Sequence, residues 1–179
     1  HVEARSQPKD TAVRFAARLR ALDLGGGRVN SLGFETGSET LGKDEAVVLA
    51  FGGNLAGDYQ DPAALLEAAV SRAPDVGLRL VGRSRPWRSS AWPDPGEPEY
   101  INFVALVEPT LKPRDTLEAI LARERQFGRE RSRPNAPRTL DVDLIAHGRQ
   151  GIDTPGLIVP HPRAYERRFV MGPLAEIAP

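Results

Sequence analysis

The sequence predicts an α+β fold in which two helices pack on one face of an antiparallel sheet. Strand-like and helix-like apolar patterns follow one another in the order β-α-β-β-α-β, and glycines and prolines separate them. A hydrophobic content of 40% is enough for one core. This order of elements is the split β-α-β, or ferredoxin-like, arrangement. We expect the domain to span residues 46–179.

The first half of the predicted domain contains a strand, a helix and a second strand. The apolar run of residues 47–51 predicts a buried strand, and Gly52-Gly53-Asn54 predicts the turn that ends it. Asp61 and Pro62 supply an N-cap and a first helical residue, so a helix is expected to about residue 72. Residues 77–88 alternate as a second strand.

The second half repeats the pattern. Residues 100–108 predict a third strand, and Lys112-Pro113 opens a helix that should continue to about residue 127. Residues 138–146 predict a fourth strand. The rest of the chain is interpreted as loop-rich, with one short strand at residues 157–159.

Residues 1–45 differ from the rest in composition. The apolar positions of residues 11–24 fit one amphipathic helix, which three glycines would end. The stretch that follows is rich in Ser, Thr, Gly and Glu and shows no apolar periodicity. We interpret this segment as an extension or linker with no assigned function.

Composition excludes several classes of function. The chain has no cysteine, so disulfides, thiol nucleophiles and thiolate metal sites are excluded, and a bound metal would be held mainly by oxygen. The formal net charge is zero, which predicts binding to neither nucleic acid nor a membrane surface. No apolar run reaches membrane-spanning length and the N-terminus has no signal-peptide pattern, so we expect a cytoplasmic location.

Two aspartates in the fourth strand form the most informative local pattern. Side chains alternate faces along a strand, so Asp141 and Asp143 should point to one face while Leu140, Val142 and Leu144 point to the other. Neighbouring carboxylates repel each other and need a positive partner. Mg²⁺ is one candidate and arginines are the other, and the Asp-x-Asp pattern alone does not choose between them.

The neighbouring charges favour a triphosphate site. Arg129 and Arg138 flank the loop before the aspartates, and cations beside a carboxylate-held Mg²⁺ are what a triphosphate requires. Glu124 shares a helix face with Leu117 and Leu121, so it should point toward the sheet, either as a structural ion pair or as part of the site.

A second set of residues would suit a planar heterocycle. Asn102 and Tyr100 share a strand face, and an amide beside aromatic rings can read hydrogen-bond patterns. Most aromatic residues are core residues, and that interpretation stays open for each tryptophan. His161 lies between two prolines, where it could contact phosphate or cap a turn.

These motifs resemble those of the 6-hydroxymethyl-7,8-dihydropterin pyrophosphokinase family in order and spacing, from about residue 47 to residue 179. The motifs are Phe51-Gly-Gly-Asn-Leu55, Tyr100-Ile-Asn102, Glu124 with Gly128-Arg-Glu-Arg131, Pro137-Arg-Thr-Leu-Asp-Val-Asp143, Pro160-His-Pro-Arg163 and Arg167-Arg-Phe169. The resemblance implies transfer of the pyrophosphoryl group of ATP to the hydroxymethyl oxygen of the pterin, with release of AMP, in folate biosynthesis. It implies two Mg²⁺ ions on Asp141 and Asp143, and transfer assisted by Arg129 and Arg138.

The resemblance also implies the binding residues. The pterin would be bound by Ser89, Trp92, Tyr100, Asn102 and Phe169. ATP would be bound by Glu124, Arg131, His161 and Arg167. ATP and the pterin alcohol are therefore the expected partners, with association to other folate-pathway enzymes as a further one.

The chain departs from the family pattern in a few places. Gly53 stands where many members have serine, Ala136 where a glycine is common, and the loop before Pro137 is one residue shorter than in a familiar bacterial form. We also expect the domain to lack the family's C-terminal segment, because the sequence ends at residue 179. An ATP- or pterin-binding scaffold without turnover therefore stays an alternative, as does an arginine-dependent nucleic-acid binder, which the zero net charge disfavours.

Overall fold

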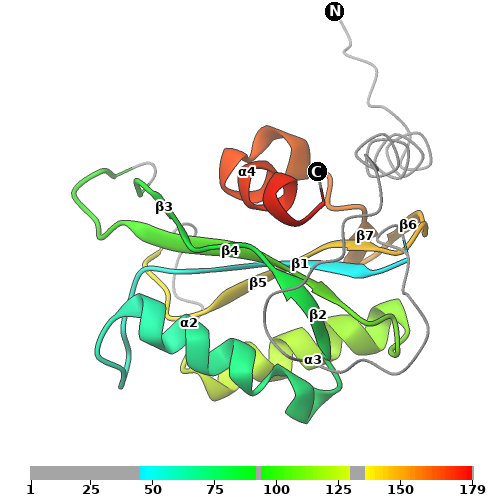
Figure 1. Cartoon of the computed structure of the whole chain (residues 1–179), viewed down its shortest axis with the longest axis horizontal. Coiled ribbons are helices and arrows are strands. Elements are labelled where there is room, and N and C mark those ends of the chain that lie inside the picture. Colours follow the sequence, from blue (N-terminus) through cyan, green and yellow to red (C-terminus); the bar gives the residue numbers. More distant parts are fainter. Residues whose placement is uncertain (1–44, 92–93, 130–135, 179) are drawn as a thin grey trace, which may run out of the picture.

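The computed structural model describes residues 45–91, 94–129 and 136–178, and one antiparallel sheet forms its centre (Figure 1). The hydrogen-bonded order is β2-β4-β1-β5, and β3 also pairs with β4. The strands are β1 (Val47–Gly53), β2 (Leu80–Arg83), β3 (Trp87–Ser89), β4 (Tyr100–Val107) and β5 (Asp141–His147). The predicted α+β class and the antiparallel sheet are confirmed.

Two helices cover one face of the sheet, as the sequence predicts. They are α2 (Pro62–Ser71) and α3 (Pro113–Gln126), with a short 3₁₀ turn η1 (Ala73–Val76) after α2. Asp61 caps α2 by accepting a hydrogen bond from the backbone N–H of Ala64, at 2.8 Å. The core between helices and sheet includes a stacked pair of rings, Phe51 and Phe103, whose centroids are 4.8 Å apart.

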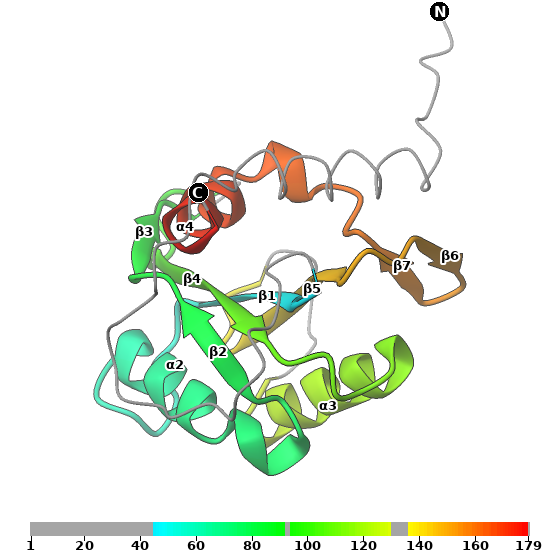
Figure 2. The same ribbon diagram turned by 45° about the vertical axis from the view of Figure 1, so that its right-hand side comes forward.

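A third helix, α4 (Arg168–Ile177), covers the opposite face of the sheet, so the molecule has three layers (Figure 2). Val170 and Leu174 on α4 are buried against Val48, Val104 and Ile145 of the sheet. The prediction that this region is loop-rich is wrong. Gly172 and Pro173 lie inside the helix, and this dipeptide is typical of loops. Burial of one helix face therefore outweighs weak local propensity.

The chain between β5 and α4 forms a small hairpin at the end of the sheet, followed by a 3₁₀ turn (Figure 1). Its strands are β6 (Ile152–Thr154) and β7 (Leu157–Val159), and the turn is η2 (Ala164–Glu166). The short strand expected at residues 157–159 is confirmed, whereas β6 was not predicted. None of the helices in the described part of the chain is long and apolar enough to cross a membrane.

Two predicted strands have different bounds in the structure. The strand expected over residues 77–88 is divided into β2 and β3, because the intervening segment contains Pro86, which cannot donate to a ladder. The fourth strand begins at Asp141 rather than at Arg138. Residues 1–44, which include the suggested helix at 11–24, lie outside the described residues.

Candidate active site

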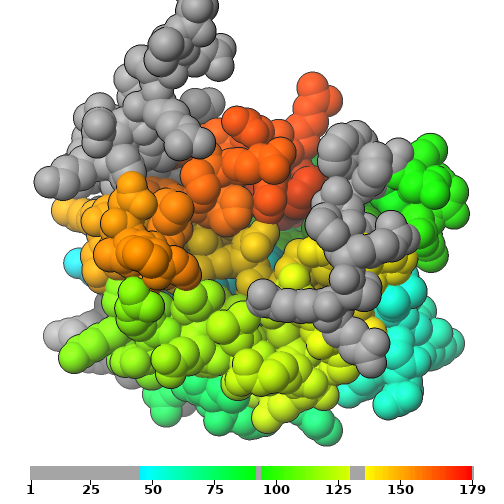
Figure 3. All heavy atoms as spheres, turned by 180° about the vertical axis from the view of Figure 1, so that it is seen from behind, coloured from blue at the N-terminus to red at the C-terminus, as the bar shows by residue number. Residues whose placement is uncertain are grey.

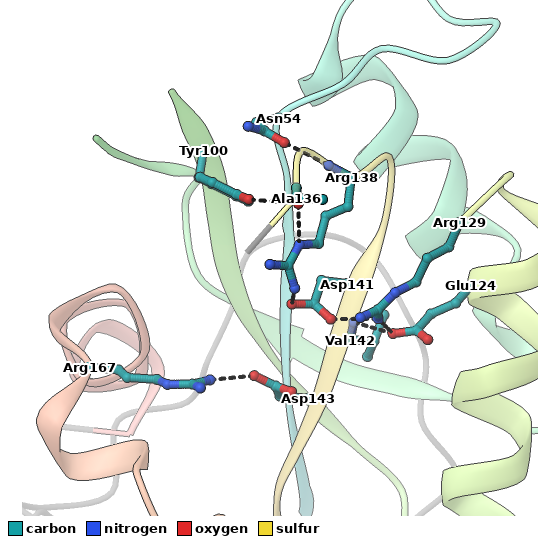
Figure 4. A network of polar contacts seen from close by, with 10 residues as sticks. All are labelled: Asn54, Tyr100, Glu124, Arg129, Ala136, Arg138, Asp141, Val142, Asp143 and Arg167. Carbon is teal, nitrogen blue, oxygen red and sulfur yellow. Dashed lines mark hydrogen bonds and ion pairs between the residues drawn. The ribbon is translucent and has the colours of Figure 1, made fainter. Parts of the chain in front are cut away.

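Asp141 and Asp143 lie on the face of β5 that α4 covers, and their carboxylates point away from the core (Figure 4). Val142, between them, is buried on the opposite face in the core under α2 and α3. The predicted alternation is therefore confirmed. Gly52 and Ala50 of β1 lie opposite the two aspartates, so small residues leave the space beside the carboxylates open.

Three arginines contact the two carboxylates (Figure 4). Arg129 and Arg138 each donate to a different oxygen of Asp141, at 2.5 and 2.7 Å. Arg167, which precedes α4, donates to Asp143 at 2.6 Å. Arginine partners were one of the two alternatives for the aspartate pair, and the structure shows that they are present.

Glu124 holds the other side of this network. The residue is 3% exposed, and its Oε1 accepts a hydrogen bond from the backbone N–H of Val142 at 2.9 Å. The same oxygen pairs with Arg129. Glu124 therefore points toward the sheet as predicted, and it fixes Arg129, one of the two arginines that reach Asp141. Among the described residues, the ion pairs of this cluster join three arginines to three carboxylates.

Burial disfavours the charged form of Arg138, but the neighbouring Asp141 and Tyr100 favour it. Desolvation acts to lower the pKa of Arg138, whereas Asp141 and Tyr100 act in the other direction and leave the pKa raised overall. The guanidinium carbon lies 5.8 Å from the centre of the Tyr100 ring. Arg138 is thus held as a cation between the Asp141 carboxylate and the Tyr100 ring.

Asn54 organises the site, although the sequence predicts only a turn at this position. Its amide Nδ2 donates to the carbonyl of Pro98 at 3.0 Å, and its Oδ1 accepts from the backbone N–H of Arg138 at 2.9 Å. The side chain is 3% exposed. Asn54 therefore joins the end of β1 to two distant segments and fixes the backbone that carries Arg138. In the sequence, the sign of this role is an asparagine that follows two glycines at the end of a strand. A local pattern of this kind does not show that the side chain is buried.

Gly53 allows this close approach of segments. A Cβ atom added at Gly53 would overlap the backbone carbonyl of Thr139. The segment that leads into β5 therefore packs directly against the backbone of β1. A serine at this position would require a shift of that segment.

Asn102, Ser89 and Tyr100 form a polar and aromatic group beside the charged network. Ser89 on β3 pairs in register with Tyr100 on β4, and the Nδ2 of Asn102 donates to Ser89 Oγ at 2.9 Å. The Tyr100 hydroxyl donates to the carbonyl of Ala136 at 3.4 Å. Three of the residues predicted to bind the heterocycle are therefore together.

Phe169 comes from the first turn of α4 and is 37% exposed. The Arg167 guanidinium carbon lies 5.7 Å from the centre of its ring. Phe169 is therefore tied through Arg167 to Asp143 and the charged network. Two other predicted site residues, Trp92 and Arg131, lie outside the described residues.

A pocket of about 200 Å³ opens beside the aspartates, between α3, β5 and the β6–β7 hairpin. Seen from behind, the surface is hollowed where β5 lies between α4 and α3 (Figure 3). The polar residues that line the pocket are Glu124, Arg129, Asp141, Asp143 and His161. The aliphatic residues that line it are Leu117, Ile120, Leu121, Val142, Leu144, Leu157 and Ile158.

His161 is fixed by its backbone. Its N–H donates to the carbonyl of Ile145 on β5 at 2.8 Å, and its Nδ1 accepts from the backbone N–H of Arg163 at 3.2 Å. Burial is the largest influence and lowers the pKa of His161 below its ordinary value of 6.5, although the Asp143 carboxylate opposes this shift. His161 is therefore neutral near pH 7.

His161 should make stability depend on pH. Because the folded pKa is lowered, the unfolded chain binds more protons than the folded one between that pKa and 6.5. The contribution is fully present above this window and is lost as the pH falls through it. We expect His161→Gln to remove this dependence when unfolding by denaturant is compared at about pH 7.5 and about pH 5.5. If the free energy of unfolding changed equally with pH in the unmodified protein and in His161→Gln, this prediction would be wrong.

The carboxylate pair can supply only part of the ligands of a divalent cation. Among the described residues, no group of three or more His, Cys, Asp or Glu side chains could hold a metal ion. Two half-buried carboxylates on one strand face instead suit Mg²⁺, which keeps several waters and shares phosphate oxygens of a substrate. The donor set therefore fits Mg²⁺ bound together with a phosphorylated ligand.

The match to a family of known proteins agrees with this geometry. Residues 48–179 match the family described as 7,8-dihydro-6-hydroxymethylpterin-pyrophosphokinase. The chain belongs to this family. The family match covers every residue of the site, and the resemblance in motif order is confirmed.

Relatives from three bacteria carry the name 2-amino-4-hydroxy-6-hydroxymethyldihydropteridine pyrophosphokinase. The protein of Methylorubrum extorquens is 36% identical over 70% of this chain and 80% of its own length. That of Synechocystis is 39% identical over 74% of this chain and 66% of its own length. The protein of Pseudomonas aeruginosa is 38% identical over 75% of this chain and 82% of its own length.

Proposed function

We propose that this chain transfers the pyrophosphoryl group of ATP to the hydroxymethyl oxygen of 6-hydroxymethyl-7,8-dihydropterin, releasing AMP, as a step of folate biosynthesis. Family membership supports the reaction. The observation that carries the proposal is the cluster of Asp141 and Asp143 with three arginines, next to the Asn102–Ser89 pair. A polyanion site thus adjoins a site for a planar polar ring.

The charged cluster would bind the triphosphate. Asp141 and Asp143 would hold Mg²⁺, as two ions in this proposal, and Mg²⁺ neutralises phosphate charge when bound. Arg129 and Arg138 would then contact the transferred group, and Arg167 another part of the phosphate chain. Glu124 would act by holding Arg129, and the pocket beside His161 would take the nucleoside, with Arg131 as a further proposed contact.

The pterin would lie between Tyr100 and Phe169, with Asn102 reading its edge. The amide of Asn102 donates to Ser89, which orients its Oδ1. A Cβ atom added at Gly52 would lie 2.8 Å from that oxygen, so any side chain there would crowd it. An acceptor at this place suits the ring N–H and amino groups of a pterin. Ser89 and Trp92 complete the proposed contacts.

The reaction would depend on positioning and on charge neutralisation. The pterin hydroxyl would attack the β-phosphorus of ATP in line with the leaving AMP, and its proton would pass to water or to the product. Phosphoryl transfer of this kind needs little help from a strong base. Rigid placement of Arg138 by Asn54 and of Arg129 by Glu124 suits such a mechanism.

An assay of AMP release tests the proposal. The chain is incubated with ATP and Mg²⁺, with and without the pterin alcohol, and AMP and the pterin product are quantified. We expect AMP to form only with the alcohol present, in amounts equal to the pterin diphosphate. Binding of both ligands without AMP release would overturn the proposal in favour of a binding domain. Association with other folate-pathway enzymes and a cytoplasmic location stay predictions.

A further inference from the structure

A hydrogen-bonded contact joins β3 to the last turn of α4. Trp87 on β3 donates its indole N–H to Glu176 Oε1 at 2.7 Å, and the backbone N–H of Arg85 donates to Glu176 Oε2 at 3.0 Å. These donors, with Arg85 first, hold the pKa of Glu176 below its usual range. One carboxylate thus binds the segment that leads into β3 at two points.

The Trp87 ring also lies directly against the backbone of α4. A Cβ atom added at Gly172 would lie 2.5 Å from Cζ3 and 2.6 Å from Cη2 of Trp87. Contacts this short do not occur between real side chains, so only glycine allows the helix and the ring to approach so closely. We call Trp87, Gly172 and Glu176 the β3–α4 clamp.

The clamp is placed to position the proposed pterin site. Trp87 is the register partner of Asn102, so both side chains lie on the face that α4 covers. Phe169, Gly172 and Glu176 follow at helical spacing on one side of α4. The clamp therefore connects the residue that would read the pterin edge with the ring that would stack on it.

The helix itself holds Phe169 less firmly than usual. Pro173 has no N–H, so the backbone carbonyl of Phe169 lacks its usual partner four residues later in the helix. Val170 and Leu174 hold α4 down on the sheet, but the buried cluster to which they belong includes no residue of β3. The position of Phe169 along the sheet therefore depends on contacts made by the clamp.

We propose that Trp87, Gly172 and Glu176 are positioning residues that set where the Phe169 ring lies relative to Tyr100 and Asn102, and so the width of the proposed pterin site between Phe169 and Tyr100. The inference rests on the proposed function. The clamp touches neither substrate in this proposal and acts through Phe169. Arg167 is the residue just before α4, but its long side chain can follow Asp143 when the helix shifts, whereas the Phe169 ring cannot adjust as freely.

The test measures the Kd of the pterin alcohol in the presence of Mg²⁺ and a non-hydrolysable ATP analogue. Gly172→Ala should weaken pterin binding about tenfold, because a small displacement of a positioning group has a large effect. The Kd of the ATP analogue should change less than about threefold. Alanine is the better helix former, so a loss cannot come from helix propensity. Ala175→Gly, on the exposed side of α4, is the matched control and should bind the pterin like the unmodified protein.

A double-variant cycle identifies the cause. A leucine side chain lacks the ring atoms of Trp87 that a Cβ at Gly172 would meet, so Gly172→Ala should have little effect in a Trp87→Leu background. Glu176→Gln is a milder substitution that loses one acceptor oxygen, and it should weaken pterin binding about threefold. It tests the clamp if Gly172→Ala does not fold. Circular dichroism and Tm verify the fold of each variant.

The outcomes separate the two hypotheses. Unchanged pterin binding in Gly172→Ala and Glu176→Gln, with normal binding and turnover by the unmodified protein, would overturn the clamp alone. Equal losses from Gly172→Ala in the unmodified protein and in the Trp87→Leu background would also overturn it. No pterin binding and no AMP release by the unmodified protein would overturn the proposed function, and the clamp with it.

Discussion

Asp141→Asn and Asp143→Asn should each lower kcat for AMP release by at least about a thousandfold. An amide retains the shape of the carboxylate but loses the charge that would hold Mg²⁺ and balance the arginines. Asp141 balances Arg129 and Arg138, whereas Asp143 balances Arg167. We therefore expect the larger loss at Asp141, where two cations would be left without their carboxylate.

The fold should survive both substitutions. The side chains of Asp141 and Asp143 are 25% and 32% exposed, so the arginines that they release can turn toward water. We expect the free energy of unfolding to change by less than about 1 kcal/mol. Steady-state kinetics, denaturant unfolding and binding of an ATP analogue with and without Mg²⁺ measure these effects.

A matched control separates the effect of losing a carboxylate in the site from the effect of losing any carboxylate on a strand. Asp153→Asn changes an exposed aspartate on β6 and should leave kcat unchanged. The binding measurement gives a second criterion: Mg²⁺ should strengthen binding of the ATP analogue to the unmodified protein and have little effect on the Asp141 and Asp143 variants. Substantial turnover by either variant would show that the pair does not hold the metal.

Arg129→Ala should lower stability and activity together. Arg129 lies between the buried Glu124 and the half-buried Asp141, and its removal takes away a cation that pairs with each of them. We expect a loss of about 2–3 kcal/mol in the free energy of unfolding, because the ion pair and hydrogen bond between Arg129 and a buried carboxylate are lost. We also expect kcat to fall at least about a hundredfold, since a cation near the transferred group is lost.

A second substitution should separate these two effects. In Arg129→Ala/Glu124→Gln, the neutral amide oxygen can still accept from the backbone N–H of Val142, and the buried negative charge is removed together with its cation. Stability should therefore recover by more than half, whereas kcat should stay low. Arg125→Ala, an exposed arginine in the last turn of α3, is the control and should change neither quantity. Recovery of activity together with stability would mean that Arg129 serves the fold alone.

The features that the sequence predicted well are those that depend on local periodicity. The period of two in residues 140–144 was enough to place both aspartates on one face and the intervening valine in the core. The spacing of Leu117, Leu121 and Glu124 was enough to direct the glutamate toward the sheet. Each pattern is a property of one element, so no tertiary information was required.

The features that were missed depend on contacts between distant segments. Nothing local shows that Asn54 reaches both Pro98 and the backbone of Arg138, or that Arg167 pairs with Asp143. The helix α4 was missed for a related reason: its Gly172-Pro173 pair is typical of a loop, and the helix is stabilised by burial of Val170 and Leu174. The glycine that weakens the local signal is the residue that allows contact with Trp87.

The alternation of side chains between the two faces of β5 at residues 141–143 also limits where residues can be inserted or deleted. Removing or adding one residue within the stretch 141–143 of β5 would turn at least one carboxylate toward the core under α3. A residue gained or lost between Arg129 and Pro137 would alter only the connection that leads into the strand. Insertions and deletions in active relatives should therefore be tolerated before the strand and absent from residues 141–143.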